Sequence, residues 1–167
     1  MHVFISSALA ISFSLVSGTA MADEAPFLAS LKGSWTGKGT VTTRIGGSPT
    51  NVSCSFDSSA RGASLAMNGT CRGFVVVQRA ISANLKADGA RYSGTYLGPS
   101  GKPSSLSGSR QGDAISLDVR WAREINGDRA ANMTIQKVGS NGLRLRTTDK
   151  DPSTGKTVVT SDINLTR

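Results

Sequence analysis

Apolar and polar residues alternate along most of this chain, and this period of two constrains its fold more than any other feature. In AISLDVRW every second residue from Ile115 to Trp121 is apolar, and serine, aspartate and arginine lie between them. NGLRLRTT alternates in the same way, and near the C-terminus Val159, Ile163 and Leu165 fall on one face. Because this alternation is typical of strands that bury one side, we expect a chain made mostly of half-buried strands.

Glycine-rich turn signals separate these stretches, among them GGSP, ARGA, ADGA, GPSGKP, QGD and NGD. Short strands with regular turns indicate an antiparallel sandwich or barrel. Only DEAPFLASL has the spacing of a helix, with Pro26 in its first turn. We expect strands over residues 35–45, 51–58, 64–73, 75–85, 92–97, 104–110, 114–121, 129–137, 141–148 and 157–167.

The first 22 residues have the pattern of a secretory signal peptide. Residues 3–16 form a run of apolar and serine residues that is shorter than the ~20 needed to span a bilayer as a helix. The small-x-small sequence Ala20-Met21-Ala22 follows it, as at a cleavage site. We therefore expect export to the periplasm or the exterior, cleavage near Ala22, and one β domain over 23–167 that does not span the membrane.

The only histidine, His2, lies inside the expected signal peptide. The remaining chain therefore cannot form a Ser-His-Asp triad, a Cys-His pair or a histidine metal site. Four carboxylates could pair as in a glycosidase, but the arginines beside them favour solvated ion pairs. We expect no enzymatic activity, no cofactor and no metal. These carboxylates are Asp113, Asp118, Glu124 and Asp128, and the neighbouring arginines are Arg120, Arg123 and Arg129.

The chain is basic, with 19 Lys and Arg against 11 Asp and Glu and a formal net charge of +8. All of these charges lie after residue 22, so the expected mature protein keeps the same charge. Such a surface attracts anionic lipid, lipopolysaccharide or acidic polysaccharide. The basic residues are scattered, however, which is also typical of an ordinary alkaline exported protein. Because the aromatic residues are dispersed as well, we do not expect nucleic-acid binding.

Two cysteines in an exported chain, Cys54 and Cys71, predict one disulfide. If RGAS forms a two-residue hairpin loop with Gly62 first, as a type II′ turn prefers, the two cysteines lie directly opposite each other. They then occupy a non-hydrogen-bonded pair, whose Cα atoms are ~4.5 Å apart, within the range that a disulfide tolerates. The same register places Phe56 opposite Gly69.

The stretch FLASLKGSWTGKGTV resembles the opening of calycin barrels, the superfamily of lipocalins, fatty-acid-binding proteins and nitrobindin-like proteins. The resemblance implies a barrel whose tryptophan closes the base against an arginine near the last strand, for which Arg167 and Arg146 are both candidates. Nitrobindin-like proteins hold haem through a histidine that this mature chain lacks, so haem ligation is not implied. The matching residues are Gly33-x-Trp35-x-Gly37-x-Gly39.

Gly37 and Gly39 share a face with Trp35 in the expected first strand. Glycines at such positions either relieve crowding where a strand bends or leave room for a ligand. The fold that we expect is all-β: a single antiparallel up-and-down barrel of about 8–10 strands with a short N-terminal helical turn. A β-sandwich is the alternative.

The expected function is the binding of a small apolar ligand or a cell-envelope component inside this barrel. One alternative is a periplasmic protease inhibitor or other protein-binding module, with ADEAPFLAS as its inserting arm. A second is a structural envelope protein that binds anionic lipid or lipopolysaccharide through its charge. The side chains expected to line the barrel interior are Trp35, Phe56, Met67, Tyr92, Tyr96 and Trp121.

Overall fold

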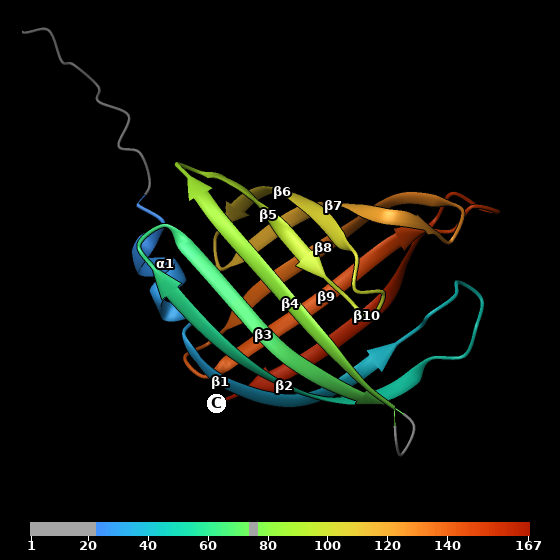
Figure 1. The fold of residues 1–167 in the computed structure, drawn as a ribbon, viewed down its shortest axis with the longest axis horizontal. Coiled ribbons are helices and arrows are strands. Elements are labelled where there is room, and N and C mark those ends of the chain that lie inside the picture. Colours follow the sequence, from blue (N-terminus) through green and yellow to red (C-terminus); the bar gives the residue numbers. More distant parts are fainter. Residues whose placement is uncertain (1–22, 74–76) are drawn as a thin grey trace, which may run out of the picture.

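The chain forms a closed antiparallel barrel of ten strands, which confirms the predicted barrel and not the sandwich (Figure 1). The computed structural model describes residues 23–73 and 77–167, so the expected signal peptide lies outside the described residues. Each strand pairs with its neighbours in the chain, and the first pairs with the last. The elements are α1 (Ala25–Ser30), β1 (Gly33–Val41), β2 (Thr50–Arg61), β3 (Ser64–Gly73), β4 (Val77–Asp88), β5 (Arg91–Leu97), β6 (Pro103–Gln111), β7 (Ala114–Ile125), β8 (Asp128–Val138), β9 (Gly142–Lys150) and β10 (Thr157–Thr166).

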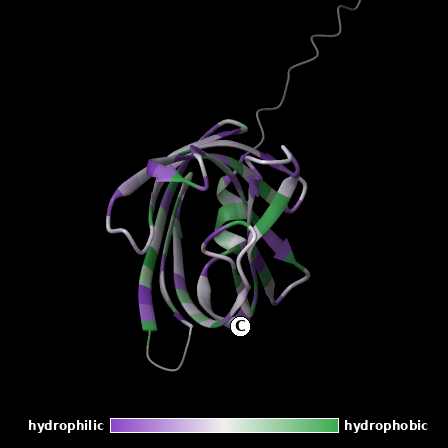
Figure 2. Cartoon of the chain, turned by 90° about the vertical axis from the view of Figure 1, so that its right-hand side faces the viewer, coloured by the Kyte–Doolittle hydropathy of each residue, from purple (hydrophilic) through white to green (hydrophobic). Residues whose placement is uncertain are grey.

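The two ends of the barrel differ. The turns after β2, β4, β6 and β8 lie at the end that holds α1, which we call the helix end. The described connections at the opposite end, the loop end, are 42–49, 98–102, 126–127 and 151–156. Figure 2 looks into the barrel from the loop end and shows α1 inside the ring of strands. Within the two described ranges, no helix is long and apolar enough to cross a membrane.

Glycine sets the tight turn that joins β2 to β3. Arg61 lies opposite Ser64, and Gly62 between them has a φ of +53°, a left-handed conformation that glycine adopts readily. Ala63 keeps a negative φ, so only the first central residue is left-handed, as in a type II′ turn. The predicted hairpin and its register are therefore confirmed.

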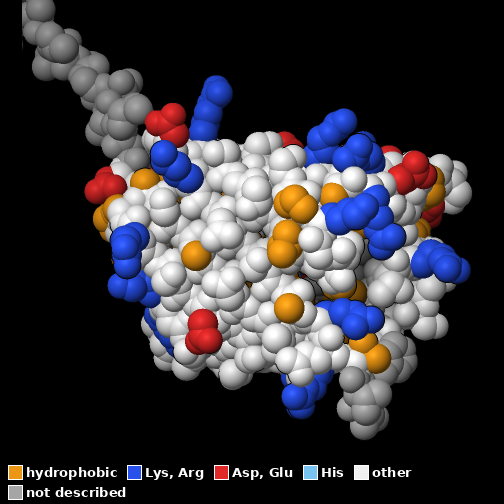
Figure 3. All heavy atoms as spheres, viewed as in Figure 1, with side chains coloured by type: hydrophobic (Ala, Val, Ile, Leu, Met, Phe, Trp, Pro, Cys, Tyr) orange, Lys and Arg blue, Asp and Glu red, His pale blue; other side chains and the backbone are white. Residues whose placement is uncertain are grey.

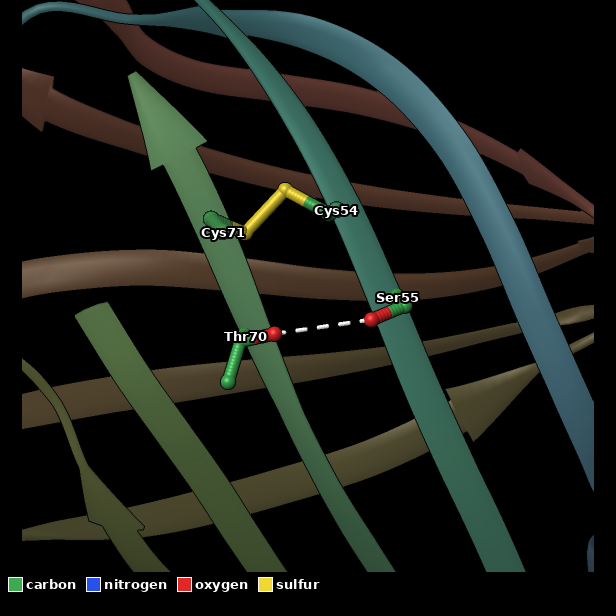
Figure 4. Close-up of a disulfide and its surroundings, with 4 residues drawn as sticks. All are labelled: Cys54, Ser55, Thr70 and Cys71. Carbon is green, nitrogen blue, oxygen red and sulfur yellow. Dashed lines mark hydrogen bonds between the residues drawn. A yellow bond between two sulfur atoms is a disulfide. The ribbon is translucent and has the colours of Figure 1, made fainter. Parts of the chain in front are cut away.

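This register brings the two cysteines together, and the predicted disulfide is confirmed. Cys54 lies opposite Cys71, with Cα atoms 4.1 Å apart and the sulfur atoms bonded (Figure 4). One residue along each strand, Ser55 and Thr70 bring their hydroxyl oxygens to 3.5 Å. Because successive side chains alternate, the disulfide faces the interior while these two hydroxyls face outward.

The prediction that Val159 shares a face with Ile163 and Leu165 is wrong. The pairing of β10 with β9 shifts between Val159 and Ser161, which inserts one extra residue into β10. Such a bulge reverses the inward and outward faces on its far side. Val159 is consequently 40 % exposed and Val158 is half-buried, whereas Ile163 and Leu165 are buried as predicted.

The core is a continuous cluster of inward-facing apolar side chains that reaches from α1 through every strand. It includes the apolar residues predicted from AISLDVRW at positions 115, 117 and 119. The helix end holds the most tightly enclosed part, because Leu28 of α1 and Leu31, which directly follows the helix, are fully buried in the same cluster as Trp35. The largest fully buried side chains are Trp35, Leu28, Leu31, Ile115, Leu117, Ile135, Leu143 and Leu165.

Gly37 and Gly39 allow β1 to approach β10 closely. A Cβ atom on Gly37 would lie 1.9 Å from the carbonyl oxygen of Asn164, and one on Gly39 would lie 2.1 Å from that of Asp162. Both obstacles are backbone atoms of β10, which cannot move aside without disturbing the pairing. Of the two interpretations of these glycines, the structure supports the relief of crowding where the barrel closes.

The disulfide should stabilise the folded barrel through the 17-residue separation that it closes. Replacing both cysteines by alanine is expected to lower the free energy of unfolding by about 3 kcal/mol, because the unfolded chain gains conformational freedom. Urea denaturation followed by fluorescence measures the change. Reductant should destabilise the wild-type protein and leave the double variant unaffected; equal sensitivity of both proteins to reductant would contradict this account.

Candidate functional site

Trp35 closes the helix end. Its indole Nε1 donates a hydrogen bond to the carbonyl oxygen of Leu31 at 3.1 Å, so its one polar atom is satisfied within the core. The guanidinium carbon of Arg167 lies 4.5 Å from the centre of the tryptophan ring, a cation–π contact. Arg167 also donates to the backbone carbonyls of Lys32 and Ser140. Of the two candidate arginines, Arg167 is therefore the one that covers Trp35.

A buried ion pair fastens the chain before α1 to the barrel wall. Glu24 is 4 % exposed, and its carboxylate accepts hydrogen bonds from Arg110 Nε at 2.6 Å and Nη2 at 3.1 Å. The hydroxyl of Tyr92 donates to the same carboxylate at 2.5 Å. Arg110 also lies over the ring of Phe27, 4.6 Å from its centre. We call Glu24, Tyr92 and Arg110 the Glu24 cluster.

The charges of this cluster fix its protonation state. The hydrogen bond from Arg110 holds the pKa of the Glu24 carboxyl below its usual value, against the opposing effect of burial. Burial raises the pKa of Tyr92, and its hydrogen bond to Glu24 raises it further. At neutral pH the carboxylate is ionised and the phenol keeps its proton. A carboxyl with a lowered pKa is a poor general acid at that pH, so the cluster's evident role is to hold α1 in place.

The expected inhibitory arm is part of this closure, which corrects the sequence interpretation. Of the stretch ADEAPFLAS, residues 25–30 form α1, whose Leu28 is fully buried, and Glu24 is bound to β5 and β6. The described part of this segment therefore lies in the barrel end and does not protrude toward a partner.

The six side chains expected to line the interior fall into two groups. Tyr96 and Trp121 are only half-buried and lie toward the loop end. Their rings contact each other edge to face, with centroids 5.9 Å apart and planes inclined at 68°. The other four are buried in the packed core: Trp35, Phe56, Met67 and Tyr92.

The Tyr96–Trp121 pair holds a polar atom without a partner. The indole Nε1 of Trp121 is buried, and no group among the described residues accepts its hydrogen bond. Arg129 fixes the strand segment here by donating to the carbonyl oxygens of Trp121 at 2.8 Å and Ala122 at 3.1 Å. Ser104, opposite Tyr96, accepts from the Ala122 N–H at 3.1 Å. Burial raises the pKa of the Tyr96 phenol, which therefore stays protonated at neutral pH.

Asn126 braces the loop end, a role that the sequence did not suggest. It occupies the turn between β7 and β8 with a left-handed φ of 55°. Its side-chain oxygen accepts from the Ile45 N–H at 3.1 Å, and its nitrogen donates to the buried carboxylate of Asp149 at 3.0 Å. The loop 42–49 is thereby tied to the end of β9.

The four candidate carboxylates do not converge on a site. Asp118 accepts from the side chain of Asn132 at 2.7 Å, and Asp128 from the Ala130 N–H at 2.8 Å. The expected ion pairs are wrong, because none of the four lies within 4.0 Å of a cation in the described part of the chain; Arg129 binds backbone carbonyls instead. Across residues 23–73 and 77–167, no cluster of three or more His, Cys, Asp or Glu could hold a metal ion.

Two shallow hollows lie on the outer face of β2 to β5. The first measures about 600 Å³, and it contains two cations, Arg61 and Lys86, and no carboxylate. The second measures about 420 Å³, and Arg79 is the one charged residue in its described lining. Figure 3 shows this face, where most side chains are neither charged nor hydrophobic and the basic ones lie toward the edges. The first hollow is lined by Ser59, Arg61, Ser64, Leu65, Ala66, Asn84, Leu85, Lys86, Ser93, Gly94 and Thr95.

Sequence reasoning missed the first hollow because its lining comes from four strands. Each strand contributes short polar residues on its outward face, a pattern that the alternation does predict. Which of these residues lie side by side depends on the register of three strand pairs, of which only the β2–β3 pair could be predicted.

The Glu24 cluster should make stability depend on pH. Replacing Glu24 by Gln is expected to lower the free energy of unfolding at neutral pH by about 1.5–3 kcal/mol, the range for hydrogen bonds to charged groups. A carboxyl whose pKa is lower in the folded chain stabilises it above the unfolded-state pKa, and this contribution is lost as pH falls through the folded-state value. The wild-type advantage should therefore shrink below about pH 4.5.

Urea denaturation of both proteins over an acid-to-neutral pH series measures this difference. Glu124→Gln is the control, because it makes the same change at an exposed carboxylate that lies in no ion pair among the described residues. A difference between wild type and Glu24→Gln that stays constant at all pH values would show that the ion pair does not stabilise the fold.

Comparison with known proteins supports the fold alone. No protein-family model and no curated protein sequence matches this chain. Among solved structures, the crystal structure of Rv2717c from M. tuberculosis superposes with a TM-score of 0.67 and 16 % sequence identity. The match covers 88 % of this chain and 98 % of that one, so the two share the barrel over nearly their whole length.

Proposed function

We propose that this chain is an exported, non-enzymatic binding protein that holds an anionic component of the cell envelope on its outer surface. The observation that carries the proposal is the first hollow, in which two cations face solvent and the described lining holds no carboxylate. Arg61 and Lys86 are both exposed there, and the rest of the lining is hydroxyl, amide and backbone apart from the methyl group of Ala66. Such a surface favours a ligand that carries negative charge and accepts hydrogen bonds.

The packing of the barrel also favours binding on the outer surface, because side chains fill the interior beneath the first hollow. Leu65 and Leu85 turn their side chains into the core beneath the first hollow, where both are buried. At the same end of the barrel, Trp35 and α1 fill the interior. The wall under the hollow is therefore rigid, and a ligand can bind outside it without disturbing the core.

The overall charge adds a long-range attraction. Three of the 19 basic side chains, those of Arg110, Arg144 and Arg146, form ion pairs among the described residues. Most of the positive charge is therefore not neutralised by a neighbouring carboxylate. A net charge of +8 on one small domain raises the local concentration of anions at its surface.

Binding to anionic envelope components should weaken as salt is added, because salt screens exposed charges. The mature protein is expected to bind lipopolysaccharide, phosphatidylglycerol vesicles or an acidic polysaccharide in dilute buffer. It should lose most of this binding near 1 M salt, where the Debye length falls to about 3 Å. Co-sedimentation and calorimetry measure the binding, with phosphatidylcholine vesicles and dextran as neutral controls. Absence of binding to every anionic probe in dilute buffer would refute the proposal.

A second candidate function is the binding of a small, largely apolar molecule that carries one hydrogen-bond acceptor at the Tyr96–Trp121 pair. The unpartnered Nε1 of Trp121 favours it, since a ligand that accepts this hydrogen bond would satisfy a buried donor. The calycin resemblance implies the same class of ligand.

Trp121→Phe tests this second candidate, because it keeps an aromatic ring and removes the indole N–H. If a molecule binds at this pair, native mass spectrometry of protein purified from its own envelope should show an added mass. That mass should be lost, or its affinity reduced about tenfold, in the variant, as expected for one buried hydrogen bond. A wild-type protein at its bare mature mass, with no uptake of a hydrophobic dye, would contradict this function.

A further inference from the structure

We infer that the first hollow is a binding site for an acidic oligosaccharide, a sugar chain with carboxylate or sulfate groups among its hydroxyls. The inference rests on the proposed function and names the ligand class of the same surface. Its starting point is the strand register, which places the lining residues of the hollow in two parallel rows.

The first row carries the charges. Arg61 lies opposite Ser64, Ser64 opposite Lys86, and Lys86 opposite Ser93, so these four residues cross β2, β3, β4 and β5 in line. Neighbouring strands are ~4.8 Å apart, so the backbones of Arg61 and Lys86 are separated by about 10 Å. Two acidic groups on one sugar chain can each meet a cation at that separation, with a serine hydroxyl between the two cations.

The second row is neutral. Two residues along each strand, Ser59, Ala66, Asn84 and Thr95 lie opposite one another in the same order. Their short side chains leave the hollow open, and three of the four can both donate and accept hydrogen bonds. This row complements the hydroxyl groups of a sugar ring, as the first row complements its acidic groups.

The nearest carboxylates on the same strands do not neutralise the hollow. Asp57 lies outside its lining and accepts a hydrogen bond from the Ser34 hydroxyl at 2.6 Å. Asp88 also lies outside it, at the end of β4, directly opposite Arg91. Arg61 and Lys86 are therefore the charged residues of the described lining, and Asp57 borders the surface opposite Asn68.

The lining favours a saccharide over the other anionic ligands. None of the described residues that line it is aromatic, so it offers no ring on which a nucleic-acid base could stack. Ala66 is its only outward apolar side chain, whereas a surface that enters a lipid interface presents large apolar or aromatic groups. Hydroxyls, an amide and two cations match a ligand that is itself hydroxylated and acidic.

The second hollow extends this surface toward the loop end. Asn68, Ser82 and Leu97 form the next row along β3, β4 and β5, and all three belong to the lining of the second hollow. The two hollows are thus adjacent along the same strands. A ligand longer than one sugar unit can follow the strands from one hollow to the other.

Calorimetric titration with two probes tests the site: an oligogalacturonate, which carries carboxylates, and heparin fragments, which carry sulfates. The affinity of the double variant Arg61→Gln and Lys86→Gln for the recognised probe should fall by at least about tenfold, because both charge-assisted contacts are lost. The matched control is Arg123→Gln with Lys156→Gln, which removes one arginine and one lysine at exposed positions outside the hollow. It should change affinity by less than about threefold.

A third variant, Asn84→Phe, separates shape from charge. It fills the second row without altering the net charge, and its exposed strand position accepts an aromatic residue. Binding should again fall about tenfold, while urea denaturation confirms an intact fold.

The outcomes distinguish this inference from the proposed function. Equal losses in the site and control variants, or an unchanged Asn84→Phe, would overturn the site and leave a general attraction to anions. Binding to anionic vesicles but to neither saccharide would overturn the ligand class alone. Failure of the wild-type protein to bind any anionic probe would overturn the proposed function as well.

Discussion

The pairing of β1 with β10 is the contact on which the rest of the structure depends, because it turns an open sheet into a barrel. An open sheet would expose the hydrogen-bonding groups of two edge strands, and closure pairs them with each other. The approach is so close that β1 can carry no side chain at Gly37 and Gly39, where a Cβ atom would meet the backbone of β10. Closure also divides every strand into an apolar inner face and a polar outer face, and both the core and the hollows follow from that division.

Closing the sheet leaves two open ends, and the two ends of the folded domain seal one of them. Glu24 and Arg167 both bind at the helix end, the first to Arg110 and the second over Trp35. A buried carboxylate is costly unless it is paired, and here Arg110 and Tyr92 together supply its hydrogen bonds. The barrel base is thus held by interactions between residues that are far apart in sequence, which also fix the register of α1 against the wall.

The sequence predicts those parts of this fold that depend on local pattern. Alternation located ten strands, and Gly62 with the two cysteines was enough to derive the register of one hairpin.

Prediction failed where the decisive contact joins residues distant in sequence or is not marked by any particular residue type. The bulge at Thr160 turns Val159 outward, although its even spacing from Ile163 and Leu165 in the sequence indicates one shared face. The partners of Glu24 lie 68 and 86 residues away, so nothing near it distinguishes a buried glutamate from a solvated one. Which outward residues of neighbouring strands lie next to one another depends on the strand registers, and the alternation of apolar and polar residues does not determine these.

The way in which this barrel uses its aromatic residues explains why its outer surface is the better candidate for binding. An interior ligand would need the space that Trp35, Phe56, Met67 and Tyr92 already fill, and truncating one buried side chain of that size to open such space costs about 2–5 kcal/mol. Tyr96 and Trp121 are the exception, since they are half-buried and the indole N–H gains nothing from its present surroundings. On the outer face, a ligand does not have to displace packed side chains. The serine, threonine and asparagine side chains of the first hollow contribute little to packing, and its two cations lie in no ion pair among the described residues, so a ligand can bind them without disturbing the fold.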